Sequence, residues 1–228
     1  MRYRPVMRRD LAECFELLPA WIGLDDSRLQ ALPALWDRLV DEPSMVSGLM
    51  EDLAAPVGNR IQGWGVTMIL PQALVQSLDL DTKPRPFVTR RIYTALLDGS
   101  FTPMTDREIG LANARGTLTM LILHYSQRDH DFSRPYVHAV IAAANDTFRA
   151  FHDGYNLRAL YYETTAMNDP VAVSSGFDLH PYADDDEIAS LPADRRPALY
   201  GLTRERARRC ASARAGVPAA NPMRAARA

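Results

Sequence analysis

The sequence predicts an α/β protein in which helices flank a sheet that contains an antiparallel pair and a buried central strand. The segment TLTMLILHY (117–125) is apolar on both of its alternating faces, as in a central strand that is covered on both sides. The segment that follows places apolar residues at helical spacing from Val137 to Phe151. Upstream, the strand-like runs 44–52 and 60–70 are joined by AAPVGN, whose proline and glycine suit a hairpin connection.

Two helices are expected before this hairpin. After a short strand over 3–7, the spacing of Asp10 and Glu13 makes a capping box at the start of the first helix. The apolar stripe of the first helix is Leu11, Cys14, Phe15 and Leu18. The segment Gly23–Ser27 interrupts the first helix, and Pro33 is expected in the first turn of the second helix. The stripe of the second helix is Leu32, Leu35, Trp36, Leu39 and Val40.

A helical insertion is predicted over 71–116, between the third and fourth strands of the sheet. Its last helix is opened by a capping box of Thr105 and Glu108, and Gly116 closes it. Helices of this kind, placed between two strands, resemble an inserted cap.

The rest of the chain supplies the long helix after the central strand and two more strands. Pro135 suits the first turn of that helix, with Ser133 as its cap. Strands are expected over 157–164 and 198–203, which gives one domain over 1–203. From 204 to 228 the chain is rich in Arg and Ala with almost no large apolar residue, which predicts a flexible tail.

Composition limits the classes of function. The formal charge of -2 argues against general affinity for nucleic acid. No apolar run approaches the roughly 20 residues that cross a bilayer, and the N-terminal segment lacks the uncharged core of a secretory signal, so we expect a cytoplasmic protein without a membrane partner. Lys83 is the only lysine, a bias typical of a GC-rich bacterial genome. Cys14 falls on an apolar helix face, which favours a buried thiol over a nucleophile or a disulfide with Cys210.

The order of these elements resembles the GNAT superfamily of N-acetyltransferases over about residues 1–200. The resemblance rests on RYRPVMRRDLAECFELL, RIQGWGVTMIL, the passage from TLTMLILHY to VIAAANDTF, and SSGFDLHPY. It implies a GNAT-like mixed, mostly antiparallel central sheet flanked by helices. Together with SMVSGLMED and RPALYGLTRERA, these segments also look like the domain that precedes the helix-turn-helix in some bacterial LuxR-type transcriptional regulators.

The resemblance implies that acetyl-CoA or another acyl-CoA binds at the turn after the central strand. GNAT enzymes carry Q/R-x-x-G-x-G/A there, because glycines let backbone amides reach the pyrophosphate. Here Gln127 and Arg128 match the first positions and Ser133 lies at the helix start, so these three are the candidate cofactor-binding residues. Asp, His and Phe replace the glycines, and two carboxylates repel a diphosphate unless a cation intervenes. Ala172 also stands where many GNAT enzymes have a proton-donating Tyr, four residues before Gly176.

Three residues are candidates for catalysis at the open end of the sheet. His124 ends the central strand, and Glu163 ends a neighbouring strand, so either can act as a general base. Tyr161 or a water can take the place of the missing proton donor. The alternative is that His124 is a hydrogen-bonded strand residue and that Tyr161, with Tyr162, packs in the core.

Family analogy places Trp21, Glu51 and Asp52 near an acceptor or other small-molecule ligand. The competing interpretation is core packing for the tryptophan and solvated hairpin charges for the two acids. No metal is expected, because the loop that holds Asp129, His130 and Asp131 matches no metal-ligand spacing even with His138 added.

These observations favour a ligand-sensing or regulatory module of GNAT-like fold whose acetyl-CoA motif has degenerated. The alternative is a divergent acyl-CoA-dependent N-acyltransferase. DNA binding is a third hypothesis: the tail has seven Arg against one Glu, but it is too short for a helix-turn-helix, which a partner would then supply. The sequence fixes neither the ligand nor the oligomeric state.

Overall fold

The computed structural model describes residues 1–129, 131, 134–142, 154–165, 172–173, 176–183, 186–192 and 196–203. Ser133, His130, Cys210 and the predicted tail over 204–228 lie outside these residues.

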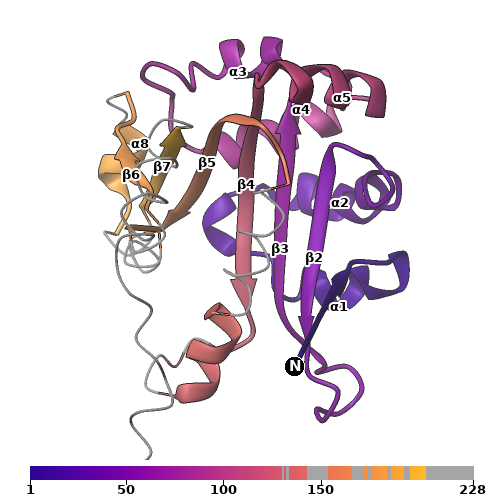
Figure 1. Ribbon diagram of the computed structural model, residues 1–228. Helices are drawn as coiled ribbons and strands as arrows, with labels where there is room; N and C mark the ends of the chain where they lie inside the picture. Colours follow the sequence, from indigo (N-terminus) through magenta and orange to yellow (C-terminus); the bar gives the residue numbers. More distant parts are fainter. Residues whose placement is uncertain are drawn as a thin grey trace, which may run out of the picture.

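The described strands form one sheet in the order β1-β2-β3-β4-β5-β7-β6 (Figure 1). The strands are β1 (Arg2–Pro5), β2 (Met45–Glu51), β3 (Ile61–Leu70), β4 (Leu118–Gln127), β5 (Leu157–Thr165), β6 (Asp178–His180) and β7 (Pro197–Thr203). β4 and β5 are the one parallel pair among them, and the other neighbours are antiparallel. The predicted mixed, mostly antiparallel sheet with β4 at its centre is therefore confirmed.

Helices cover the sheet on both faces. The helical elements with described bounds are η1 (Arg8–Asp10), α1 (Leu11–Phe15), η2 (Ala20–Ile22), α2 (Asp26–Leu39), α3 (Gln72–Ser77), α4 (Val88–Leu97), α5 (Asp106–Arg115) and α8 (Asp186–Ser190). Residues 135–142 are also helical. Leu121 of β4 packs in the core that α1, α2 and α4 share, whereas its neighbours Met120 and Ile122 pack with Ile109 of α5. Successive residues of a strand point to opposite faces, so β4 is buried on both.

The helical insertion between β3 and β4 is confirmed as α3, α4 and α5 (Figure 1). The capping box of Thr105 and Glu108 is present, and Gly116 ends α5 in a left-handed conformation with φ of 65°. Glycine adopts this conformation without the steric cost that a Cβ atom imposes.

The predicted capping box of Asp10 and Glu13 is wrong. The box that forms lies one turn earlier, where the backbone N–H of Met7 donates to Asp10 at 2.8 Å. Asp10 also accepts two hydrogen bonds from the Arg4 guanidinium, at 2.6 and 2.8 Å. Glu13 instead accepts the Ile61 N–H of β3 at 2.9 Å. The nearby guanidinium fixes Asp10, because paired N–H donors bind a carboxylate more strongly than one neutral amide does.

The expected position of Pro33 in a first turn is also wrong. α2 begins at Asp26, after the N-cap Asp25, so Pro33 lies inside the helix. Proline cannot donate the hydrogen bond that the carbonyl of Leu29 would accept. Both residues lie on the exposed side of α2, where water can bind that carbonyl.

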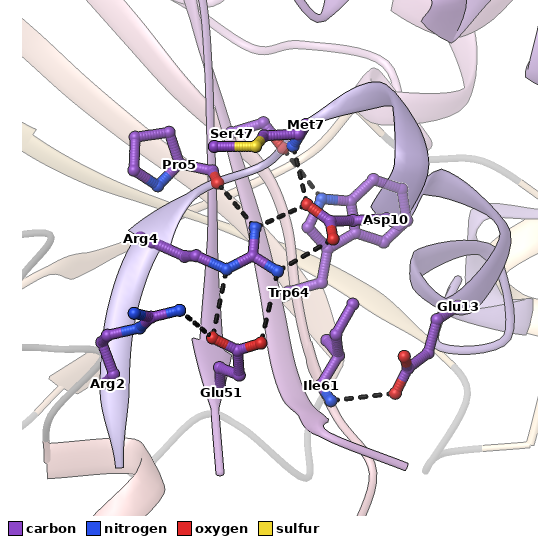
Figure 2. Close-up of polar contacts among 10 residues, drawn as sticks. All are labelled: Arg2, Arg4, Pro5, Met7, Asp10, Glu13, Ser47, Glu51, Ile61 and Trp64. Carbon is purple, nitrogen blue, oxygen red and sulfur yellow. Dashed lines mark hydrogen bonds and ion pairs between the residues drawn. The ribbon is translucent and has the colours of Figure 1, made fainter. Parts of the chain in front are cut away.

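A cluster of charged side chains joins β1 and β2 to the first helical turn (Figure 2). Arg4 lies at its centre and contacts Asp10 on one side and Glu51 on the other, with Glu51 Oε2 at 3.2 Å from Nε. Arg2 adds a bond to the same Glu51 oxygen at 2.6 Å. Both carboxylates are more than nine-tenths buried, so each needs the arginine that it contacts. The cluster thus holds β1, the edge strand, against β2 and the first helical turn.

Cys14 is a free, buried thiol, as expected, and burial raises its pKa to about 12. Such a thiol carries almost no reactive thiolate at neutral pH. Across the described ranges, no helix has the length and apolar character that a membrane span requires.

Candidate active site where two parallel strands part

The parallel strands β4 and β5 separate before either one ends. Their register runs from Leu118 and Leu157 to Ile122 and Tyr162, and stops there. Beyond this point β4 stays paired with β3 as far as Gln127, and β5 stays paired with β7 as far as Thr165. An irregularity in the β3–β4 pairing, between Val66 and Thr67, lies at the same level. The two strands are therefore no longer paired with each other beyond this point, and we call this region the β4–β5 gap (residues 123–127 and 163–165).

The first turn of α4 bridges this gap. The backbone N–H groups of Val88 and Thr89 donate to the carboxylate of Glu163 on β5, at 2.8 and 2.5 Å. The Thr89 hydroxyl donates to the carbonyl of Leu123 on β4 at 2.9 Å. Thr89 thus bonds to both strands at the level where their own pairing has stopped.

Glu163 is fully buried and serves as the acceptor at the N-terminus of α4. Its carboxylate also accepts a hydrogen bond from the Tyr182 hydroxyl. Burial raises the pKa of Glu163, and the hydrogen bonds from Tyr182 and Thr89 oppose that rise. A negative side chain is favoured at this end of a helix, because free amides and the helix dipole converge there. In this conformation the Glu163 carboxylate therefore accepts the hydrogen bonds of the first amides of α4.

His124 is fully buried beside Trp64, with ring centroids 4.5 Å apart and an interplanar angle of 75°. Neither of its ring nitrogens has a hydrogen-bond partner within the described residues. Burial lowers the pKa of His124 to about 3, because an imidazolium would lose its hydration there. His124 is therefore a neutral imidazole near pH 7.

The Tyr161 hydroxyl donates to Asp81 at 3.1 Å, in the connection after α3. Burial first, and then the Asp81 carboxylate, raise the pKa of Tyr161. Its ring lies 5.7 Å from the ring of His180. None of the hydrogen bonds in the described ranges joins two of the three predicted catalytic residues, His124, Glu163 and Tyr161. Their catalytic roles stay predictions.

Two of the predicted cofactor-binding residues, Gln127 and Arg128, lie at the end of β4. The Arg128 guanidinium donates to the Ile61 carbonyl at 3.1 Å and forms ion pairs with Glu13 and Glu16 of the first helical segment, each at 3.3 Å. The side-chain oxygen of Gln127 is buried and has no partner among the described residues. Ser133 lies outside the described residues, so its role, like those of Gln127 and Arg128, stays a prediction.

Arg134 supplies a cation in the loop after β4, and sequence reasoning missed it. Its guanidinium forms an ion pair with Asp129. The second Asp129 oxygen accepts the backbone N–H of Asp131 at 2.9 Å. The sequence contained the signal, since Arg134 directly precedes the proline that begins a helix. Arg134 reduces the repulsion that the loop carboxylates exert on an anion.

The three predicted ligand residues lie in three different sets of contacts. Trp21 is half-buried in η2 and packs against the core beneath α1 and α2. Glu51 belongs to the charged cluster of Figure 2, where Arg4 and then Arg2 lower its pKa. Asp52 accepts hydrogen bonds from the Ala54 N–H and the Tyr136 hydroxyl, both at 2.9 Å, which lower its pKa. Their ligand roles stay predictions.

Thr89 and Tyr182 were also missed by sequence reasoning. Both contact Glu163 from elements distant in the chain, and no local pattern marks either of them. The signal lay in Glu163 itself, because a carboxylate inside the apolar strand LRALYYETT requires hydrogen-bond donors from elsewhere. Within the described ranges, no group of three or more His, Cys, Asp or Glu side chains is arranged to hold a metal ion.

Comparison with solved structures finds chains whose overall fold is similar to this one. Arabidopsis thaliana NAA60, solved with a bisubstrate analogue, is 14% identical, with 89% of this chain and 97% of that chain covered and a TM-score of 0.50. The C-terminal condensation domain of Ebony, solved with beta-alanyl-dopamine, is 11% identical over 89% and 98% of the two chains, with a TM-score of 0.50. The spermidine/spermine N-acetyltransferase SpeG from Vibrio cholerae is 12% identical over 92% and 95%, with a TM-score of 0.47.

The chain therefore has a GNAT-like fold. No protein-family model matches it, and no curated protein matches it either. At these identities the solved structures define the fold alone.

Proposed function

We propose that this protein is a divergent acyl-CoA-dependent N-acyltransferase that binds the arm of its thioester substrate in the β4–β5 gap. The observation that supports this proposal is the end of the β4–β5 register at Ile122 and Tyr162. Beyond that pair, β4 presents a strand edge that β5 no longer covers. An extended molecule that carries amide groups can hydrogen-bond to such an edge as an added strand would. The arm of coenzyme A has this chemistry.

The diphosphate of the cofactor would lie by the loop after β4. Arg128 and Arg134 are the cations nearest in sequence, and the helix over 135–142 begins there. Each arginine is paired with a partly exposed carboxylate, Glu16 for Arg128 and Asp129 for Arg134. Glu16 is 60% exposed, and exposed ion pairs contribute little to stability, so a diphosphate can replace this carboxylate at small cost.

Catalysis would depend mainly on positioning. A neutral amine attacks the thioester carbonyl, the C–S bond breaks, and the amine proton passes to water while water or Tyr161 protonates the thiolate. His124 is a weak base at a pKa of about 3, and Glu163 is occupied by the amides of α4. Alignment of two bound reactants can by itself lower a barrier by about 7–11 kcal/mol.

A second function, ligand sensing without acyl transfer, is favoured by one specific observation. Glu163, Tyr161 and Arg128 all have partners within the chain. The same fold would then act as the input module of a regulator, as the resemblance to LuxR-type proteins implies. Such a protein would bind an acyl-CoA or another small molecule and would not consume it.

Titration calorimetry and thermal unfolding with acetyl-CoA test the proposal. At 100 times its dissociation constant, acetyl-CoA is expected to stabilise the fold by about 2.7 kcal/mol. Arg128→Gln is expected to weaken this binding, and Arg107→Gln, on an exposed face of α5, is the matched control. Release of free CoA thiol with a panel of amines supports the acyltransferase, whereas saturable binding without thiol release supports the sensor. Absence of binding contradicts the acyltransferase.

A further inference from the structure

We infer that the first turn of α4, Phe87–Arg90, is a gate that closes the β4–β5 gap in this structure and opens to admit the acyl ligand. This inference rests on the proposed function. It adds a closed state, a latch that holds it and a residue, Thr89, that competes with the ligand.

Thr89 occupies the hydrogen-bonding position that a ligand would need. Its hydroxyl donates to the carbonyl of Leu123, the first residue of β4 beyond the last pair with β5. That carbonyl is the first acceptor on the β4 edge that an extended amide would meet. Thr89 is fully buried, so the hydroxyl must leave before a ligand amide can take its place.

The backbone of the gate is strained at Phe87. Phe87 has φ of 57° and ψ of 46°, a left-handed conformation that is unfavourable for a residue with a side chain. The Arg90 guanidinium stacks on the Phe87 ring at 3.9 Å and stabilises this conformation. Relief of the strain favours any alternative in which the turn unwinds.

Three residues from the C-terminal part of the chain, Tyr182, Ala183 and Glu187, hold the gate closed, and we call them the latch. Arg90 donates two hydrogen bonds to Glu187 of α8, at 2.8 and 2.9 Å. Just before the gate, the Pro84 carbonyl accepts the N–H of Ala183 at 2.8 Å. Tyr182 contacts Glu163 behind the gate. Glu187 thus contacts the gate directly, and Ala183 and Tyr182 contact residues on either side of it.

The outermost of these contacts is the weakest. The Arg90 and Glu187 side chains are 28% and 52% exposed, so solvent and salt screen their attraction. The remainder of α4 is anchored by Ile92, Tyr93 and Leu96, which are buried in the core. Opening can therefore be confined to the first turn, with the rest of the helix in place.

Glu187→Gln tests the latch, with Asp37→Asn on the exposed side of α2 as the matched control. Amide hydrogen exchange at Val88 and Thr89 is expected to rise about two- to fivefold in Glu187→Gln and to stay unchanged in the control. Exchange in the unaltered protein is expected to rise with salt. Equal exchange in all three proteins overturns the gate, and this readout needs no ligand, so it is independent of the proposed function.

Affinity for acetyl-CoA tests whether the gate lies in the path of the ligand. Thr89→Val removes the hydroxyl that competes for the Leu123 carbonyl, and Thr89→Ser retains it. Acetyl-CoA is expected to bind several-fold more tightly to Thr89→Val and Glu187→Gln than to the unaltered protein, with Thr89→Ser unchanged. Faster exchange at the gate with identical affinities in all four proteins overturns the inference, because the turn would then move without controlling access.

Discussion

Glu163→Gln is expected to lower the free energy of unfolding by about 2–4 kcal/mol, although the two side chains have nearly the same size. Both carboxylate oxygens accept hydrogen bonds, from Val88 on one side and Thr89 on the other, deep in the core. A glutamine offers one oxygen and one NH₂ group, so a donor would face a donor at one of these amides. A buried donor without an acceptor costs the fold its desolvation energy.

Urea unfolding followed by tryptophan fluorescence measures this effect. Glu108→Gln is the matched control, because Glu108 also accepts the hydrogen bonds of a helix start, at the exposed N-terminus of α5. The control is expected to lose no more than about 1 kcal/mol. If the two variants lose the same amount, Glu163 is not the buried anchor of α4.

Acidification is expected to destabilise the protein through His124, with the loss beginning near pH 6.5 and continuing toward pH 3. The folded-state pKa of about 3 lies below the ordinary value of 6.5. Between these two pH values the unfolded chain therefore binds a proton at His124 that the folded protein does not bind. Stability from the neutral imidazole is thus complete above pH 6.5 and falls as pH drops. One pKa unit corresponds to about 1.4 kcal/mol, which makes the full loss about 5 kcal/mol.

The difference in unfolding free energy between the unaltered protein and His124→Phe isolates this contribution. Phenylalanine keeps a ring against Trp64 and cannot be protonated. The difference is expected to be flat above pH 7 and to decrease by about 1.4 kcal/mol per pH unit below pH 6. A difference that does not change with pH would show that His124 is hydrated or hydrogen-bonded in the fold, contrary to its buried position.

The sheet and most of its helices could be predicted from the sequence because their signals are local. The doubly apolar strand of β4, the hairpin of β2 and β3, and the capping box at Thr105 each depend on neighbouring residues alone. The errors arose at the starts of the first two helices. Arg4 fixes Asp10 and thereby moves the expected capping box, and the earlier start of α2 places Pro33 inside a helix.

The candidate site was less predictable, because its contacts cross the whole chain. The sequence indicated that His124, Glu163 and Tyr161 lie near the end of neighbouring strands, and it gave no sign that α4 would cover them. Thr89 lies 74 residues from Glu163 and contacts it through a backbone N–H, which every non-proline residue carries. Arg128, selected as a cofactor ligand by its place after β4, contacts Glu13 and Glu16 across the sheet edge.

Amide hydrogen exchange with and without saturating acetyl-CoA tests most directly whether the β4–β5 gap is the ligand site. We expect slower exchange at the amides of residues 123–127, which the bound arm would cover, together with faster exchange at Val88 and Thr89 as the gate is displaced. Saturation with acetyl-CoA that leaves residues 123–127 unchanged would contradict the account, because the ligand would then lie elsewhere on the protein.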